Sequence, residues 1–206
     1  FCFLAFCYEM KAYSDSNFSD SFITTLPIQA DCSNSGLQHY SAMMRDEVGG
    51  SATNLVPSNR PSDVYNLVAL EVTRKLKSKT DDMAKKWLAY GIDRKICKKP
   101  VMCLPYSLTR YSCRQYLEDH VAKELTERGT KHEFGEDLFK STAYLTPIVW
   151  ESINDVVVKA RDIMDFLKSI ARLVASENLP VCWTTPLGFP VQMMCYKKES
   201  KRVKTK

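Results

Sequence analysis

The sequence has no C-x-x-C pair and holds only three histidines among its 206 residues. Structural zinc sites are usually built from paired cysteines and histidines, so this pattern argues against a zinc site. No signal peptide is recognisable, and the opening run FCFLAFC is too short to span a membrane. The eight cysteines are therefore interpreted as reduced, buried thiols of a cytosolic protein rather than as a disulfide framework.

Internal repeats and low-complexity linkers are also absent, and the charge is only mildly basic. A hydrophobic content of 45% favours one or two compact domains with a true core. The net charge of +5 permits a nucleic-acid partner without requiring one. Part of the excess is local, because six of the residues in 197–206 are Lys or Arg. That segment is interpreted either as part of a nucleic-acid surface or as solubilising charge. The two ends of the sequence, Phe1 and KRVKTK, indicate a piece of a longer reading frame.

The hydrophobic periodicity predicts a mostly α protein with a small β contribution near each end. Residues 1–10 are expected to be the end of a buried helix, and residues 11–25 an exposed loop. The apolar run 26–30 is expected to form a strand, and Gly49-Gly50 a turn. An amphipathic helix is expected over 61–79. The remaining expected elements are a helix after the turn cluster 31–36, helices over 81–90, from 93 with a bend at Pro100, over 110–128 and over 147–177, and a hairpin over 181–196.

The first candidate site residue is Asp31, which follows the expected strand 26–30. A carboxylate beside turn backbone is a common way to hold a divalent cation, since hard cations prefer carboxylate and carbonyl oxygens. The alternative is an Asx turn or a helix N-cap, in which the same carboxylate bonds neighbouring amides. The local pattern leaves both interpretations open.

The second candidate is the segment IDRKICKKPVMCLPYS at residues 92–107. Arg94, Lys98, Met102 and Tyr106 recur at intervals of four, so they are expected to share one helix face. We call these residues the four-residue stripe. Two cations near a helix N-terminus are suited to an anion such as phosphate. The alternatives are a solvated helix face for the cations and a buried, hydrogen-bonded core position for Tyr106.

Several long segments resemble the single-subunit DNA-directed RNA polymerases of bacteriophages and mitochondria, in the order in which that family has them. The likeness is strongest to the short-tailed phage branch and covers nearly the whole sequence. The segments are FCFLAFCYE, DCSNSGLQHYSAMMRDEVGG, NLVPS, WLAYGIDRKICKKPVMCLPYS, RQYLED, WESI, FLKSIARL and WTTPLGFPVQ.

The resemblance implies a right-hand polymerase architecture, with part of the palm in 1–47 and the fingers in 48–206. It implies that Asp31 and the backbone carbonyl of Cys32 are ligands of catalytic Mg²⁺. It further implies that Arg94 and Lys98 bind the triphosphate of the incoming nucleotide and that Tyr106 helps to distinguish ribose from deoxyribose. Two-metal phosphoryl transfer would then extend RNA on a DNA template.

The sequence departs from the family in three places. Cys32 and Ser107 each stand where the family usually has glycine, next to Asp31 and Tyr106. The second metal carboxylate of the family, in a His-Asp-Ser motif, does not occur in this sequence. The isolated chain is therefore expected not to polymerise. The basic segment 197–206 matches the start of the hairpin that reads the promoter.

The implied partners are the DNA template and promoter, nascent RNA and nucleoside triphosphates, with no membrane and a monomeric enzyme. The implied location is the cytoplasm of an infected bacterial host, with the mitochondrion as the alternative. Two other functions stay open: part of a related single-chain DNA polymerase, and a nucleic-acid-binding remnant without chemistry.

Overall fold

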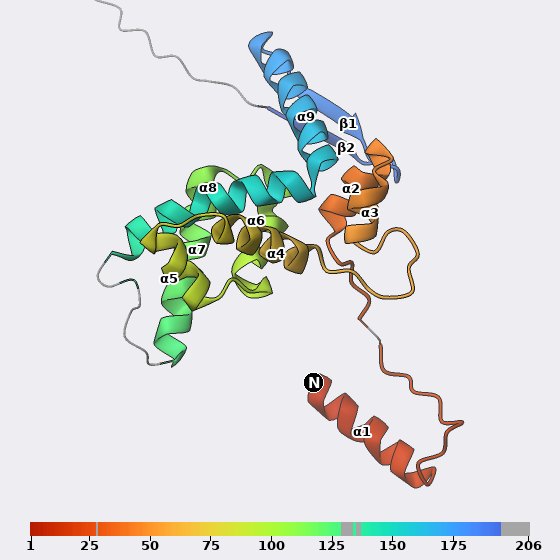
Figure 1. The fold of residues 1–206 in the computed structure, drawn as a ribbon. Coiled ribbons are helices and arrows are strands. Elements are labelled where there is room, and N and C mark those ends of the chain that lie inside the picture. The colour runs from red at the N-terminus through yellow and green to blue at the C-terminus, as the bar shows by residue number, and fades with distance from the viewer. Residues whose placement is uncertain (28, 129–133, 135–136, 195–206) are drawn as a thin grey trace, which may run out of the picture. The chain divides into compact units, whose positions relative to one another are not determined.

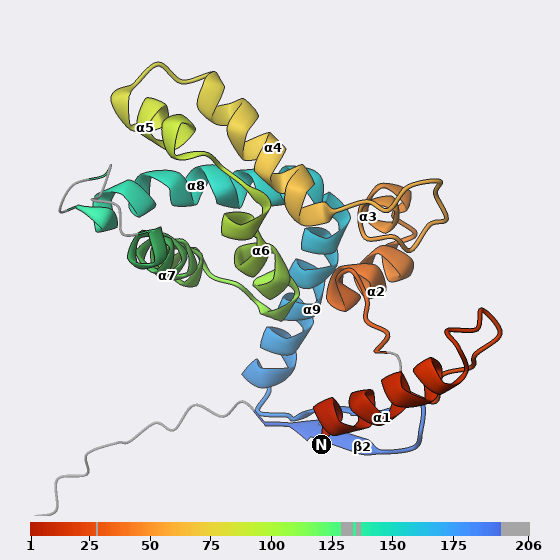
Figure 2. The same ribbon diagram turned by 90° about the horizontal axis from the view of Figure 1, so that it is seen from below.

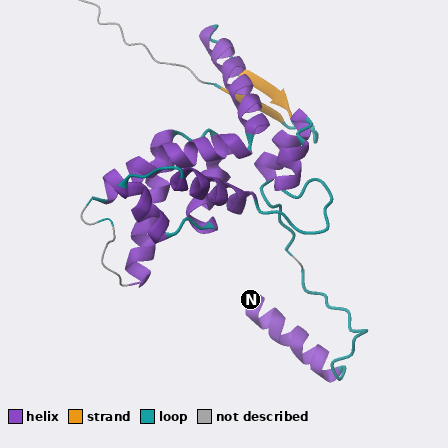
Figure 3. Cartoon of the chain, viewed as in Figure 1, coloured by secondary structure: helices purple, strands orange, loops and turns teal. Residues whose placement is uncertain are grey.

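The computed structural model describes residues 1–27, 29–128, 134 and 137–194. Most of this chain is helical, and the one sheet within the described residues has two strands (Figure 3). The predicted class, mostly α with a small β contribution, is confirmed. The chain divides into two compact units, Phe1–Cys32 and Ser33–Lys206. No helix among the described residues is long and apolar enough to cross a lipid bilayer.

The first unit holds a single helix, α1 (Cys2–Asp15). The predicted buried helix end is wrong, because none of the α1 residues is buried and Phe1, Phe3 and Tyr8 are largely exposed. The helix also extends into the segment expected to be a loop. One helix and one turn offer too little surface to enclose these side chains.

The predicted strand at 26–30 is also wrong for the residues that the structure describes there. Strand backbone groups need a partner strand to bond with. The two described strands, β1 (Val181–Thr184) and β2 (Pro190–Met193), pair antiparallel with each other. The apolar run therefore has no described strand beside it. The hairpin itself was predicted, and it is confirmed over the described residues 181–193.

The core of the second unit lies among four helices. They are α4 (Val64–Lys77), α6 (Arg94–Cys103), α7 (Arg110–Arg128) and α8 (Leu138–Val156). The helix α4 packs on both α6 and α8, and α7 packs on both α6 and α8 (Figures 1 and 2). The apolar face predicted for α4 is mostly buried, and only Leu67 remains 39% exposed.

The short helix α5 (Asp82–Tyr90) joins α4 to α6 and is anchored by Trp87. This indole is fully buried, and its Nε1 donates a hydrogen bond to the carbonyl of Ser141 in α8 over 3.1 Å. The ring of Phe134 lies 4.3 Å away, centroid to centroid. The predicted span of this helix and the predicted span of α7 are both confirmed.

The helix start expected at residue 147 is wrong. The helix α8 begins at Leu138, after the N-cap Asp137, and Pro147 lies inside it. An internal proline costs about 3 kcal/mol. Leu145, Ile148 and Val149 on either side of Pro147 are buried, and this packing keeps the helix continuous.

The predicted single tract beyond Pro147 is instead two helices. The chain turns at Val157, a buried residue with non-helical backbone angles (φ −122, ψ 51), before α9 (Val158–Ser176) begins. The helix α9 leads away from α8 and carries the hairpin beside it (Figure 1). The predicted end of the tract near residue 177 is confirmed.

Two helices, α2 (Ser35–Met44) and α3 (Glu47–Ala52), pack together, and α2 also packs on α9. The predicted Gly-Gly turn is wrong, since Gly49 and Gly50 are buried inside α3. A Cβ on Gly49 would meet the Ser41 hydroxyl at 2.5 Å. This close approach of α2, and not a turn, is what the glycine permits.

The prediction of reduced cysteines holds for the seven that the structure describes, which are all free. Burial was predicted less well, because Cys2, Cys7, Cys32 and Cys182 are exposed. Cys97 and Cys113 are buried in the core between α6 and α7, and burial raises the pKa of each thiol to about 12. Cys195 and the basic segment 197–206 lie outside the described residues.

Candidate functional site

The four-residue stripe lies on the exposed side of α6 and of the short 3₁₀ helix η1 (Leu104–Tyr106) that follows it. Its four side chains are all exposed, with Met102 at 43% and Tyr106 at 75%. The opposite face is packed into the core through Ile96, Cys97, Pro100, Val101 and Leu104. The stripe is therefore held by a rigid buried face while its own groups face outward.

The start of α6 follows the local sequence signals. Gly91 ends α5 with φ +88, a conformation that glycine adopts without strain. The side chain of Asp93 then accepts hydrogen bonds from the amides of Lys95 at 2.9 Å and Ile96 at 3.1 Å. Because this carboxylate already occupies two amides of the first turn, an anion at this end would depend on cationic side chains.

Arg94 is held by Asp63, the N-cap of α4, and by Tyr65 in the first turn of that helix. Its Nε donates a hydrogen bond to Oδ2 of Asp63, and its Cζ lies 5.1 Å from the centroid of the Tyr65 ring. The other oxygen of Asp63 caps α4, accepting from the amides of Tyr65 and Asn66 at 3.0 and 3.3 Å. Nothing in the sequence indicates this pairing, although Asp63 precedes the amphipathic segment at a position typical of a helix N-cap.

Lys98 is exposed one turn further along α6. Within the described part of the chain, no hydrogen bond or ion pair of its ammonium group is found. Its neighbour Lys99 differs, because its ammonium lies 4.3 Å from the ring centroid of Tyr116 in α7. Lys98 can therefore bind an anion without first breaking an interaction with another described residue.

Tyr106 is not a core aromatic, since three quarters of its surface is exposed. It is the last residue of η1, and Ser107 after it adopts a left-handed conformation, with φ 64 and ψ 43. An L residue with a Cβ is strained there by about 1–2 kcal/mol relative to glycine. The sequence departure at Ser107 therefore falls on a backbone position that favours glycine.

Replacing Ser107 with glycine is expected to stabilise the protein by about 0.5–1 kcal/mol. Relief of the left-handed strain exceeds the extra chain entropy of glycine in the unfolded state. The melting temperature, followed by calorimetry, should rise by about 1–4 °C.

The matched control is Ser169→Gly. Ser169 is an exposed serine inside α9, and its hydroxyl bonds the Phe166 carbonyl. Glycine inside a helix is unfavourable, so the control should lower the melting temperature. If both variants lower it, strain at Ser107 is not the governing term.

The end of α6 is supported from behind by α2. A Cβ on Gly36 would lie 2.7 Å from Cβ and from Cγ of Pro105, so α2 and η1 approach so closely that only glycine fits at position 36. The Tyr40 hydroxyl donates a hydrogen bond to the Pro105 carbonyl over 3.2 Å. The position of η1, and of Tyr106 on it, is fixed in part by these two residues. Sequence periodicity could not have found them.

Asp31 belongs to the first unit, whereas the four-residue stripe belongs to the second. The Asp31 carboxylate is exposed, and its Oδ1 accepts a hydrogen bond from the Cys32 amide over 2.8 Å. Among the described residues, no group of three or more His, Cys, Asp or Glu is placed to hold a metal ion. These residues alone therefore do not form a complete metal site, and Asp31 offers a single carboxylate.

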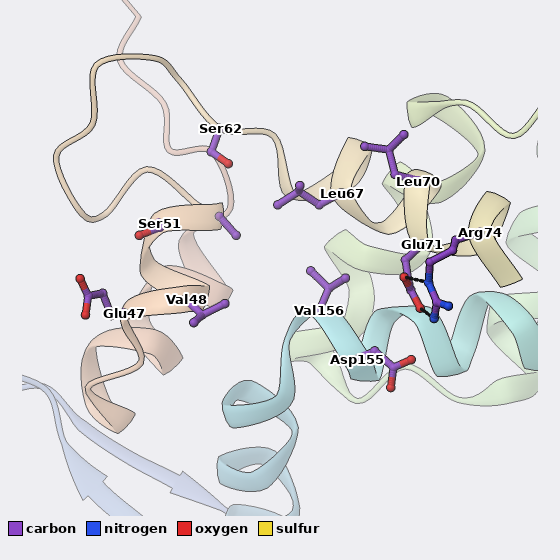
Figure 4. Close-up of a pocket in the computed structure, with 11 residues that line it drawn as sticks. Glu47, Val48, Ser51, Ser62, Leu67, Leu70, Glu71, Arg74, Asp155 and Val156 are labelled. Carbon is purple, nitrogen blue, oxygen red and sulfur yellow. Dashed lines mark hydrogen bonds and ion pairs between the residues drawn. The ribbon is translucent and has the colours of Figure 1, made fainter.

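A groove of about 740 Å³ lies between α3, α4 and the junction of α8 with α9 (Figure 4). One wall carries a two-bonded ion pair, in which Arg74 donates to both carboxylate oxygens of Glu71 at 2.8 and 2.6 Å. The bonds from Arg74 hold the pKa of Glu71 below its usual value. None of the predicted site residues lines this groove. Its lining is Glu47, Val48, Ser51, Ala52, Ser62, Leu67, Leu70, Glu71, Arg74, Asp155 and Val156.

A profile of the family described as DNA-dependent RNA polymerase matches residues 1–206. The chain is 34% identical to the DNA-directed RNA polymerase of Enterobacteria phage T3, with 98% of this chain and 27% of that enzyme aligned. It is likewise 34% identical to the T7 RNA polymerase of Escherichia phage T7, over 96% of this chain and 26% of that enzyme. The DNA-directed RNA polymerase 1 of Arabidopsis thaliana mitochondria is 34% identical over 98% of this chain and 21% of that enzyme.

The chain thus spans about a quarter of the length of these relatives. The alignment with the phage T3 enzyme runs over 242 residues, which is more than the chain possesses, so part of that stretch has no counterpart here.

Proposed function

Because this chain belongs to the DNA-dependent RNA polymerase family, we propose that it forms part of an enzyme that extends RNA on a DNA template from nucleoside triphosphates. The observation that carries the proposal is the four-residue stripe. It presents two cations and a phenol on one exposed face of a helix, in a chain that matches the family over its whole length.

In this proposal the stripe binds one incoming nucleotide along its length. Arg94 and Lys98 bind the triphosphate, since charge-assisted hydrogen bonds to phosphate are strong and directional. Tyr106, exposed at the other end, reads the sugar. Phosphoryl transfer depends mainly on positioning and on neutralising charge, so residues that only hold and orient the triphosphate still contribute to rate.

The proposal extends to a divalent metal ion, Mg²⁺, for which Asp31 and the Cys32 carbonyl would be ligands. The metal would neutralise phosphate charge. Because the described residues contain no group of three or more His, Cys, Asp or Glu placed to hold a metal ion, the other ligands would have to come from elsewhere in the enzyme.

We assign residues 1–47 to the palm and 48–206 to the fingers of a right-hand polymerase. We further propose promoter DNA and nascent RNA as partners, a monomeric enzyme and action in the cytoplasm of an infected bacterium.

The test is template-directed synthesis by the full-length polymerase, with ribonucleotides and deoxyribonucleotides supplied separately. Promoter-dependent RNA synthesis with a strong preference for ribonucleotides is expected. A preference for deoxyribonucleotides would favour a DNA polymerase instead. Binding of DNA with neither product would favour a nucleic-acid-binding remnant.

Replacing Tyr106 with phenylalanine is expected to weaken discrimination against deoxyribonucleotides. The exposed ring is kept, but one hydrogen bond in a closed, desolvated site is lost, which is worth about 1–3 kcal/mol, or about tenfold to a hundredfold in the ratio. The measured quantity is the ratio of kcat/KM for a ribonucleotide to that for its deoxy counterpart. Ribonucleotide use itself should change little.

The control for this prediction is Tyr111→Phe, which alters another exposed tyrosine, on α7. Its ratio should match the unmodified enzyme. The Tyr106 variant is also measured with Ser107→Gly, because a second hydroxyl beside the ring could substitute for the lost one. An unchanged ratio in both backgrounds would rule out a sugar-reading role for Tyr106.

A further inference from the structure

We propose that Asp63 is a positioning residue for the nucleotide, acting through Arg94. The inference rests on the proposed function, because it assigns a partner to the arginine that is proposed to bind triphosphate. Asp63 lies 31 residues before Arg94, at the N-cap of another helix, and none of the segments quoted for the family resemblance contains it.

The geometry of Asp63 makes it a fixed support. One carboxylate oxygen accepts the amides of Tyr65 and Asn66 and so is tied to the first turn of α4. The other oxygen accepts the Nε–H of Arg94. A carboxylate bound at both oxygens has little freedom to rotate, and α4 is itself held in the core by Val64, Val68 and Val72. Asp63 therefore transmits the position of a buried helix to an exposed side chain.

Tyr65 forms the second side of this support. The Arg94 guanidinium lies over its ring, and that ring is only 6% exposed. The Tyr65 hydroxyl donates a hydrogen bond to the Ser33 carbonyl over 2.9 Å. An arginine that rests on an anchored ring and on a fixed carboxylate loses little further freedom when it binds a ligand.

The pairing leaves the ligand-binding part of Arg94 available. A guanidinium carries five N–H donors in a planar fork, and Asp63 is bonded to the single Nε–H. The four N–H groups of the two Nη atoms can then bond phosphate oxygens in pairs. Asp63 also lowers the net charge around Arg94. If Asp63 only competed with the nucleotide for the guanidinium, removing its charge would strengthen nucleotide binding. If Asp63 positions the guanidinium, removing its charge would weaken nucleotide binding.

The variant Asp63→Asn separates the roles without removing the helix cap, because asparagine caps helices about as well as aspartate. In the full-length polymerase we expect KM for nucleoside triphosphate to rise about threefold to tenfold, the cost of ordering one long side chain at binding. The turnover number should stay within about twofold, because the lost interaction acts equally on bound substrate and transition state.

The matched control is Asp81→Asn. Asp81 caps α5 through the Ala84 amide and has a side-chain partner in Tyr144, so it shares the features of Asp63 except the contact with Arg94. Its KM should be unchanged. Arg94→Ala is measured alone and combined with Asp63→Asn. If Asp63 acts through Arg94, the second change should add almost nothing to the first.

Three results would overturn the inference. A fall in KM for Asp63→Asn would make Asp63 a competitor for Arg94. An unchanged KM for Asp63→Asn, with a raised KM for Arg94→Ala, would remove Asp63 from binding and leave the proposed function intact. An unchanged KM for Arg94→Ala would remove the proposed role of Arg94 itself, and the inference with it.

Discussion

Replacing Asp31 with asparagine in the full-length polymerase is expected to reduce RNA synthesis by about a thousandfold or more. Asparagine keeps the shape of the side chain and its capacity to accept the Cys32 amide bond. It removes the negative charge that a hard divalent cation requires. Metal-assisted charge neutralisation contributes several kcal/mol, and each 1.36 kcal/mol corresponds to tenfold in rate.

The measurement is the single-turnover rate of nucleotide addition on a preformed template complex, across a range of Mg²⁺ concentrations. Template binding, followed by fluorescence anisotropy, should persist. Asp20→Asn is the control, since Asp20 is an exposed aspartate of the same unit. A rate near that of the unmodified enzyme would leave Asp31 as a turn residue only.

Replacing Lys98 with alanine is expected to lower kcat/KM for nucleoside triphosphates by about tenfold to a hundredfold. A hydrogen bond from an ammonium group to phosphate is worth about 1.5–3 kcal/mol. The fold should be almost unaffected, because Lys98 is exposed and has no bonded partner within the described residues. Steady-state kinetics with each nucleotide and a melting curve measure the two effects separately.

Lys99→Ala provides the comparison for Lys98. It removes the same charge from the next position of α6, but that cation lies over the Tyr116 ring of α7. Nucleotide use should change far less in this variant. Equal losses for the two variants would indicate a general effect of helix charge. A large fall in melting temperature for Lys98→Ala with unchanged kinetics would make that residue structural.

Local signals in the sequence predicted local structure well. Gly91 and Asp93 mark the boundary between α5 and α6, and both act as the sequence indicates. The placement of Arg94 and Lys98 on one face follows from their spacing alone, because helix geometry relates neighbours in sequence directly to neighbours in space. Failures arose where packing outweighed a local signal, as at Pro147, whose flanking residues are buried within α8.

Contacts between distant segments could not be predicted in this way. The Asp63–Arg94 pair joins the N-cap of α4 to the first residue of α6, and nothing in the periodicity of either helix indicates the other. The strand expected at 26–30 failed for a related reason, since a strand is defined by its partner. The role of Gly36 depends on Pro105, which lies far along the chain.

The close contact between Gly36 and Pro105 makes the two ends of the stripe mechanically unequal. Tyr40 also bonds to Pro105, so η1 is the better-held end of the segment, and any rotation of α6 is expected to pivot there. The stretch from Arg94 to Tyr106 is a lever arm of roughly 18–20 Å. Each degree of rotation about η1 would carry Arg94 through about 0.3 Å, while Tyr106 would barely move. Since Arg94 is bonded to Asp63 at the start of α4, either α4 would move together with α6 or the bond between Asp63 and Arg94 would break.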